Sequence, residues 1–169
     1  MIMSRNWTSP IVLIALLGLV WMMRGDGFPE QAPAMPVPIL DGDRIDFAQP
    51  QGRVRLVSFW STSCAPCIRG MPALAQTHRR HHARGFDVVA VAMSYDAPSH
   101  VQAFARREAL PFRVGFDPVG DLARGFGGVN ATPTSYLVDR DGRIVKRFIG
   151  TPDHVALDAM IEKLLTPAS

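Results

Sequence analysis

The feature that most constrains the fold is an apolar strand that runs directly into a helix bearing two cysteines. Val54 to Trp60, VRLVSFW, is rich in apolar and β-forming residues and predicts a buried strand. A helix is expected from Cys64 to about Arg84. Pro66 falls in its first turn, where a proline costs little, and Pro72 should kink it.

The remaining pattern alternates strands with helices. Strands are expected over 86–93, 112–116, 134–138 and 144–149, a small hairpin over 39–47, and helices over 97–109, 119–126 and from Asp153 onward. The turn Asp141-Gly142 makes the last two strands a hairpin. This order predicts an α/β sandwich with a central mixed β-sheet flanked by helices. The last helix should bury Val155, Leu157, Met160, Ile161, Leu164 and Leu165.

Residues 1–24 are predicted to form a membrane anchor or signal segment. The apolar run from Trp7 to Met23 is about 17 residues long, which is short for a membrane-spanning helix. Arg5 precedes the run and Arg24 follows it, but Asp26 and Glu30 come soon after, so the charge bias favours the N-terminus inside. We therefore expect a single N-terminal hydrophobic helix in the bacterial inner membrane, with the domain facing the periplasm. A cleaved signal peptide, leaving a soluble periplasmic protein, is the alternative.

Residues 25–37 are rich in proline and predict an extended linker. Residues 38–167 then form one domain, which is long enough to bury its own core without disulfide staples. With 18 basic and 15 acidic residues the net charge is only +3, and no aromatic stacking pattern accompanies it, so nucleic-acid binding is not expected. The basic run over 77–84 is interpreted as a solvated helix end, with a docking patch as the alternative.

The chain contains two cysteines, and both lie in one Cys-x-x-Cys. A disulfide between Cys64 and Cys67 closes too small a loop to stabilise the fold much, which favours a chemical role. A thiolate is the nucleophile in disulfide exchange, and the first turn of a helix stabilises Cys64 in that form. Cys67, one turn further on, can attack a mixed disulfide at Cys64. We therefore expect Cys64 to be the exposed attacking sulfur and Cys67 the more buried, resolving one.

Metal binding and a purely structural disulfide are the competing interpretations of the pair. A structural zinc site needs four ligands, and the histidines of the same helix lie roughly 16 Å or more from Cys64 by helical rise. No metal ligand is assigned, and no cofactor is expected beyond the redox-active disulfide. A copper-binding metallochaperone stays an alternative because soft thiolates suit copper(I). Incidental metal binding by His78 and His82, four residues apart, is also open.

Three features resemble the thioredoxin superfamily, and more closely its extracytoplasmic TlpA/ResA/DsbE-like branch, over residues 36–166. They are the segment FWSTSCAPC, Pro72 five residues after the second cysteine, and Ala131-Thr132-Pro133-Thr134 before the strand SYLVD. The resemblance implies a cis Pro133 beside the cysteines and a Thr132 backbone that pairs with an extended substrate segment. It also implies that Trp60 supports the active-site turn, with ordinary core packing as the alternative.

The sequence departs from cytosolic thioredoxins at Ser58, where that family keeps a buried aspartate able to take the proton of the resolving thiol. The TlpA/ResA-like branch tends to place an acidic residue just after the next strand. Asp96 is the candidate there for proton transfer. The competing interpretation is that Asp96 caps the helix that begins at Ala97.

Together these features predict a thiol–disulfide oxidoreductase. By resemblance, it should reduce disulfides of extracytoplasmic protein partners and receive electrons from a membrane partner, with cytochrome c biogenesis as one possible pathway. A disulfide oxidase that uses the same cysteine pair is an alternative, since the direction depends on the reduction potential. A peroxidase of related fold is disfavoured, because its reactive cysteine does not normally sit in a Cys-x-x-Cys.

Overall fold

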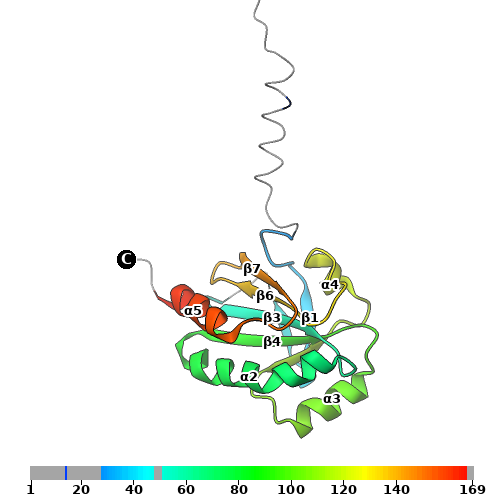
Figure 1. Cartoon of the computed structure of the whole chain (residues 1–169). Helices are drawn as coiled ribbons and strands as arrows, with labels where there is room; N and C mark the ends of the chain where they lie inside the picture. The colour runs from blue at the N-terminus through cyan, green and yellow to red at the C-terminus, as the bar shows by residue number, and fades with distance from the viewer. Residues whose placement is uncertain (1–13, 15–27, 48–50, 167–169) are drawn as a thin grey trace, which may run out of the picture.

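A five-stranded mixed sheet forms the centre of the computed structural model, which describes residues 14, 28–47 and 51–166 (Figure 1). Its order is β5-β4-β3-β6-β7. The parallel strands β3, β4 and β5 lie on one side, β6 is antiparallel to β3, and β7 is antiparallel to β6. The strands are β3 (Val54–Trp60), β4 (Phe86–Ala92), β5 (Arg113–Phe116), β6 (Thr134–Val138) and β7 (Ile144–Ile149). The predicted α/β sandwich with a mixed sheet is confirmed.

Helices cover both faces of this sheet (Figure 1). They are α2 (Ala65–His81), continued by the 3₁₀ turn η1 (His82–Arg84), then α3 (Pro98–Arg107), α4 (Asp121–Gly125) and α5 (His154–Leu165). Side chains of α2, α3 and α5 share one apolar cluster, for example Leu74, Phe104 and Leu157. The α4 side contributes Leu122 and Phe126 to a second cluster on the opposite face. The site described below lies on the α2 face.

The central strand β3 is buried along its whole length. Because side chains alternate along a strand, Leu56 and Trp60 join the cluster under α2, whereas Val57 and Phe59 join the cluster on the other face. Ser58 lies between Leu56 and Trp60 on the same face. The strand therefore presents a buried hydroxyl beneath the start of α2.

A small second sheet pairs β1 (Pro36–Pro38) with β2 (Arg44–Asp46) in antiparallel fashion. The hairpin expected over 39–47 is therefore present, but its first strand begins earlier. Residues 39–43 instead form the turn, in which the Ile39 amide donates to the Asp43 carbonyl at 2.9 Å.

The described part of the expected linker, residues 28–37, lies against the domain. The Ala32 amide donates to the Gly142 carbonyl at 2.9 Å, and the Ile144 amide donates to the Glu30 carbonyl at 2.8 Å. A Cβ atom added at Gly125 would lie 2.9 Å from Pro33, which shows how closely this segment crosses α4. The segment thus pairs with the chain at the start of β7 (Gly142 to Ile144) and packs against α4. The division of the chain at residues 24 and 37 stays a prediction.

The hydrophobic helix predicted over 1–24 lies, apart from Ile14, outside the described residues. Within the described ranges, no helix combines the length and the apolar character that a bilayer crossing requires.

The last helix, α5, begins as predicted at the N-cap Asp153. The Asp153 carboxylate accepts from the Val155 amide at 2.8 Å and from the Ala156 amide at 3.1 Å. Leu157 and Ile161 are fully buried. The prediction for Val155 was wrong: its side chain is 81% exposed, because the first turn of α5 points it away from the sheet.

Candidate active site

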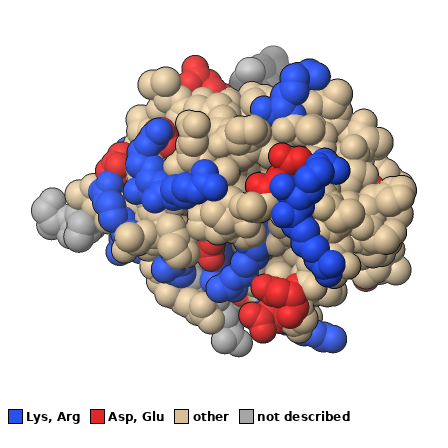
Figure 2. Space-filling view, turned by 90° about the horizontal axis from the view of Figure 1, so that it is seen from below, with Lys and Arg blue, Asp and Glu red and all other residues tan. Residues whose placement is uncertain are grey.

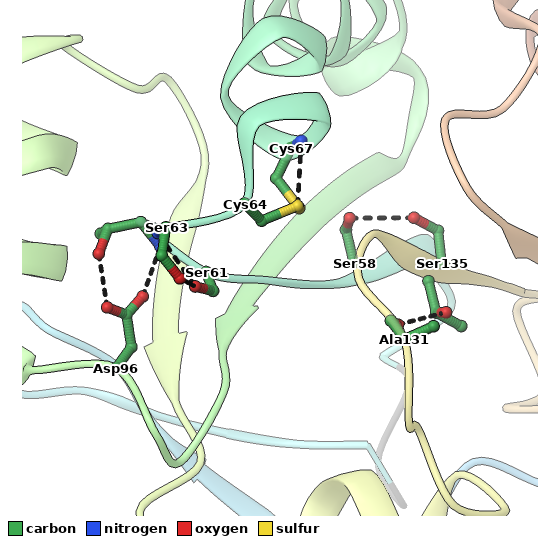
Figure 3. The surroundings of a disulfide bond; sticks show 10 residues. Ser58, Ser61, Ser63, Cys64, Cys67, Asp96, Ala131 and Ser135 are labelled. Carbon is green, nitrogen blue, oxygen red and sulfur yellow. Dashed lines mark hydrogen bonds between the residues drawn. A yellow bond between two sulfur atoms is a disulfide. The ribbon is translucent and has the colours of Figure 1, made fainter.

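Cys64 and Cys67 form a disulfide where β3 passes into α2 (Figure 3). Cys64 is the N-cap of the helix and is half-buried, whereas Cys67 is only 4% exposed. The Cys67 amide donates to Cys64 Sγ at 3.2 Å. The two cysteines therefore differ in exposure as expected, and Cys64, at the start of the helix, is the more accessible residue.

The start of α2 suits a thiolate at Cys64. The first amides of a helix have no partner within the helix, and they mark the positive end of its dipole. Pro66 lies within the first two residues of α2, where its missing N–H breaks no helical bond. When the disulfide is reduced, this helix terminus stabilises negative charge on Cys64 Sγ.

The turn before the cysteines is tied to Asp96. The Thr62 amide donates to Asp96 Oδ2 at 2.6 Å, and the Thr62 hydroxyl donates to Asp96 Oδ1 at 2.5 Å (Figure 3). Within the turn, the hydroxyls of Ser61 and Ser63 lie 2.7 Å apart. The interpretation of Asp96 as a helix cap was wrong. The N-cap of α3 is Ala97, whose methyl group makes no capping bond, and both Asp96 oxygens are bonded to Thr62 instead.

A small cavity of about 30 Å³ lies on the other side of the disulfide, against Cys67. Ser58 and Ser135 line it, and the Ser135 hydroxyl donates to Ser58 Oγ at 2.9 Å (Figure 3). Two neutral hydroxyls thus occupy the place where, by the resemblance, cytosolic thioredoxins keep a buried carboxylate. Trp60, Pro133 and His154 also line this cavity.

The loop before β6 brings Pro133 to the cysteines. The Thr132–Pro133 peptide bond is cis, and the Pro133 carbonyl accepts from the Gly150 amide at 2.8 Å. The Thr134 hydroxyl donates to the Ala131 carbonyl at 2.7 Å and closes the loop. Among the described residues, no backbone group bonds to the amide or carbonyl of Thr132, which is half-buried.

Trp60 lies at the end of β3 and is 1% exposed. Its ring packs on Phe104 of α3, with centroids 5.1 Å apart. It also lines the cavity beside Cys67. Trp60 therefore packs in the core and also forms part of the wall of the site.

One group of side chains in the described part of the chain could hold a metal ion: His78, His82 and Asp87, whose ligand atoms lie within 4.8 Å of one another. Neither cysteine belongs to it. Arg53 already contacts His82 Nδ1 at 3.2 Å. Burial raises the pKa of Asp87, but His78, Arg113 and Arg53 outweigh it and hold that pKa below its ordinary value. The arginines oppose a further cation, so the group is better described as a buried contact between two side chains, with His78 Nε2 3.3 Å from Asp87 Oδ1.

The basic end of α2 meets acidic residues of α5. Buried His81 lies 3.2 Å from Asp158 and 3.3 Å from Glu162, and Arg84 bonds to Glu162 at 2.6 Å. Burial lowers the pKa of His81. Figure 2 shows basic side chains interspersed with acidic ones on the face seen from below. Much of the charge in the run over 77–84 is therefore compensated within the fold.

The comparisons with known proteins decide the family. The sequence profile of the Redoxin family matches residues 25–163. The chain belongs to the redoxin family. Among its curated relatives, the thiol-disulfide oxidoreductase ResA of Bacillus thuringiensis (strain Al Hakam) is 28% identical over 163 residues, covering 91% of this chain and 93% of ResA. The thioredoxin-like protein YneN of Bacillus subtilis is 31% identical over 160 residues, covering 88% and 92%.

Solved structures agree with this assignment. A candidate thioredoxin of Neisseria meningitidis has a TM-score of 0.74 and 33% identity, covering 80% of this chain and 91% of that one. A candidate thiol:disulfide interchange protein DsbE of Chlorobium tepidum has a TM-score of 0.74 and 30% identity, covering 82% and 98%. With its cysteine pair, this redoxin-family member is a thiol–disulfide oxidoreductase of thioredoxin-like fold.

Sequence reasoning found the cysteines and the proline loop but missed three polar neighbours. Thr62 had no signal of its own, because its partner Asp96 is 34 residues away. Ser135 lies 77 residues from Ser58. His154 reads as the ordinary first residue of a helix after the cap Asp153, and only the packing of α5 brings it to the cavity beside Cys67.

Proposed function

We propose that this redoxin-family enzyme reduces disulfides of extracytoplasmic protein partners through a mixed disulfide at Cys64. One observation carries the proposal: a half-buried Cys64 at a helix N-terminus is disulfide-bonded to a buried Cys67. In such a pair, the accessible Cys64 can attack the partner disulfide, and the buried Cys67 can then resolve the mixed disulfide.

The reaction transfers two electrons from the reduced pair to the partner. The Cys64 thiolate attacks a partner disulfide, forms a mixed disulfide and releases one partner thiolate. Cys67, once deprotonated, attacks Cys64 Sγ, so that the Cys64–Cys67 bond forms and the bond to the partner breaks. The second partner sulfur leaves as a thiolate, and both partner sulfurs are protonated from solvent.

Substrate binding is proposed at the loop before β6. The backbone groups of Thr132 lack partners among the described residues, and Pro133 lines the cavity beside Cys67. An extended partner segment could therefore pair with Thr132 and place its disulfide over Cys64. Main-chain pairing of this kind selects for extended backbone more than for sequence.

The setting of the reaction is part of the same proposal. The apolar run within residues 1–24 supports a single anchor in the bacterial inner membrane with the domain in the periplasm, or, if it is cleaved, a soluble periplasmic protein. Electrons would then come from a membrane donor. Disulfides of proteins in cytochrome c biogenesis are one substrate class that the resemblance supports.

Single-cysteine variants test the proposal. Cys64→Ser should abolish the reduction of a disulfide substrate such as insulin. Cys67→Ser should instead accumulate a covalent complex with the substrate, because the mixed disulfide forms and is not resolved. Non-reducing gels and mass spectrometry measure the complex, and His100→Gln, on the exposed surface of α3, is the matched control.

Two measurements separate the alternatives. A reduction potential of the pair near that of thioredoxin is expected for a reductant, whereas a strongly oxidising value would indicate a disulfide oxidase. Metal analysis of the reduced protein addresses the copper-binding alternative. Stoichiometric copper(I) without disulfide exchange would overturn the proposed function.

A further inference from the structure

We propose that His154 accepts the proton of the Cys67 thiol when that thiol resolves the mixed disulfide. The inference rests on the proposed function, since it assigns a residue to its second step. It starts from the cavity beside Cys67, which the N-terminus of α5 closes on one side.

The buried thiol needs a proton acceptor. Cys67 is 4% exposed, and a thiol attacks only as its thiolate, a form that burial in apolar surroundings disfavours. The hydroxyls of Ser58 and Ser135 next to it bond to each other and are far too weakly basic to take the proton. Asp96 has both carboxylate oxygens bonded to Thr62, on the Cys64 side of the disulfide (Figure 3).

His154 is the ionisable side chain that shares the cavity with Cys67. Of the described residues that line the cavity, only Cys67 and His154 carry an ionisable side chain. His154 Nδ1 is buried and has no hydrogen-bond partner among the described residues, although the residue as a whole is only half-buried. Imidazole is the commonest general base of proteins near neutral pH.

The cavity can connect the two groups through a water molecule. Its volume of about 30 Å³ exceeds the roughly 10–15 Å³ that one water needs. Trp60, which lines it, also has a buried Nε1 without a partner in the described structure, so the site offers several polar partners to a water. General bases act over a direct hydrogen bond or through one such water.

The charged groups around His154 leave it available. On α5, the Asp153 carboxylate is engaged by the Val155 and Ala156 amides, and Asp158 is engaged by Arg80 and His81. The residues that face the cavity from α2, β3 and β6 carry no charged side chain apart from a Cys67 thiolate, once formed.

The proton of Cys67 passes to His154 Nδ1, and the Cys67 thiolate attacks Cys64 Sγ. The Cys64–Cys67 bond forms, the bond between Cys64 and the partner sulfur breaks, and the electron pair leaves on the partner sulfur. His154 then releases its proton to solvent, which the half-exposed side of the residue reaches.

The test separates the two steps with a chromogenic aromatic disulfide, added in one equivalent to the reduced full-length protein. The chain has only two cysteines, so the first release of coloured thiolate reports attack by Cys64 and the second reports attack by Cys67. In His154→Gln, the second phase should slow by about tenfold or more at neutral pH and lose the pH dependence of an imidazole. The first phase should not change, and His100→Gln should match the wild type in both.

The outcomes distinguish the inference from the proposed function. If the wild type shows no two-phase release, the mixed-disulfide mechanism itself fails. If the wild type shows both phases and His154→Gln has an unchanged second phase, the inference is overturned. If the glutamine variant does not fold, an NMR pH titration of the His154 imidazole in the wild-type protein replaces it. The titration curve should differ between the oxidised and the reduced protein. Superimposable curves would overturn the inference.

Discussion

The two flanks of the disulfide hold titratable groups in opposite circumstances. On the Cys64 flank, both Asp96 oxygens accept short hydrogen bonds from Thr62. On the Cys67 flank, His154 Nδ1 is buried without a partner among the described residues. A carboxylate held by charge-assisted bonds fixes the backbone, whereas a base without a fixed partner can exchange a proton. Under the His154 proposal, the Cys64 flank positions the active-site turn and the Cys67 flank supplies proton transfer.

Asp96→Asn should have the largest effect after the cysteine and His154 variants. The amide replaces a charged acceptor of two hydrogen bonds, so we expect a loss of about 2 kcal/mol in the free energy of unfolding. The active-site turn should loosen, and the Cys64 phase of disulfide exchange should slow several-fold. Urea unfolding and the two-phase thiolate release measure both effects.

The same variant tests the proton-transfer role that the sequence suggested for Asp96, which stays a prediction. If Asp96 only positions the turn, the pH dependence of the Cys67 phase is retained in Asp96→Asn. A pH profile of the Cys67 phase altered as strongly as in His154→Gln would give the carboxylate that role and remove the distinction between the flanks.

The fold was largely predictable because its strands are short segments rich in β-forming residues that alternate with helical segments. β3, β6 and β7 have the bounds that the sequence predicted. Local pattern also found the cysteine pair and the Asp153 cap. It failed for Val155, because periodicity alone does not say where a helix begins to touch the sheet.

The polar surroundings of the cysteines could not be predicted in the same way. Asp96 precedes a helix, and its sequence position suits either a helix cap or proton transfer, yet its carboxylate bonds to Thr62, 34 residues earlier. The contact between Ser58 and Ser135 spans 77 residues. Such contacts depend on how the strands are ordered in the sheet, and that order is not a property of any local segment.

Ser58→Ala should have a smaller effect, confined to the Cys67 flank. It leaves the buried Ser135 hydroxyl without its acceptor, at a cost of about 1 kcal/mol in the free energy of unfolding. Because the hydroxyls are not the base, the Cys67 phase should change by less than about threefold. Ser135→Ala and the double variant complete a cycle that isolates the coupling energy of the pair. If Ser58→Ala slowed the Cys67 phase as much as His154→Gln does, the two hydroxyls would take part in proton transfer from Cys67.

Asp87→Asn should have the smallest effect on exchange, and it is the matched control for Asp96. Both aspartates are buried, but Asp87 pairs with His78 near the opposite end of α2 from the cysteines. Neither phase of thiolate release should change. If either phase shifts as it does in Asp96→Asn, then any buried carboxylate perturbs the site and the contrast between the flanks is lost.

The Asp87 carboxylate should nevertheless affect how the free energy of unfolding depends on pH. Burial raises the pKa of Asp87, but His78 and the neighbouring arginines bring it below the ordinary value of 3.8. The unfolded chain therefore binds this proton more readily than the folded protein. The stabilisation by Asp87 is complete above that ordinary value and is lost as the pH falls through the lower, folded pKa. In urea unfolding between about pH 5 and pH 3, the difference in the free energy of unfolding between wild type and Asp87→Asn should become smaller as the pH falls. If this difference in unfolding free energy does not change with pH, the Asp87 carboxylate is not stabilised by His78 and the arginines.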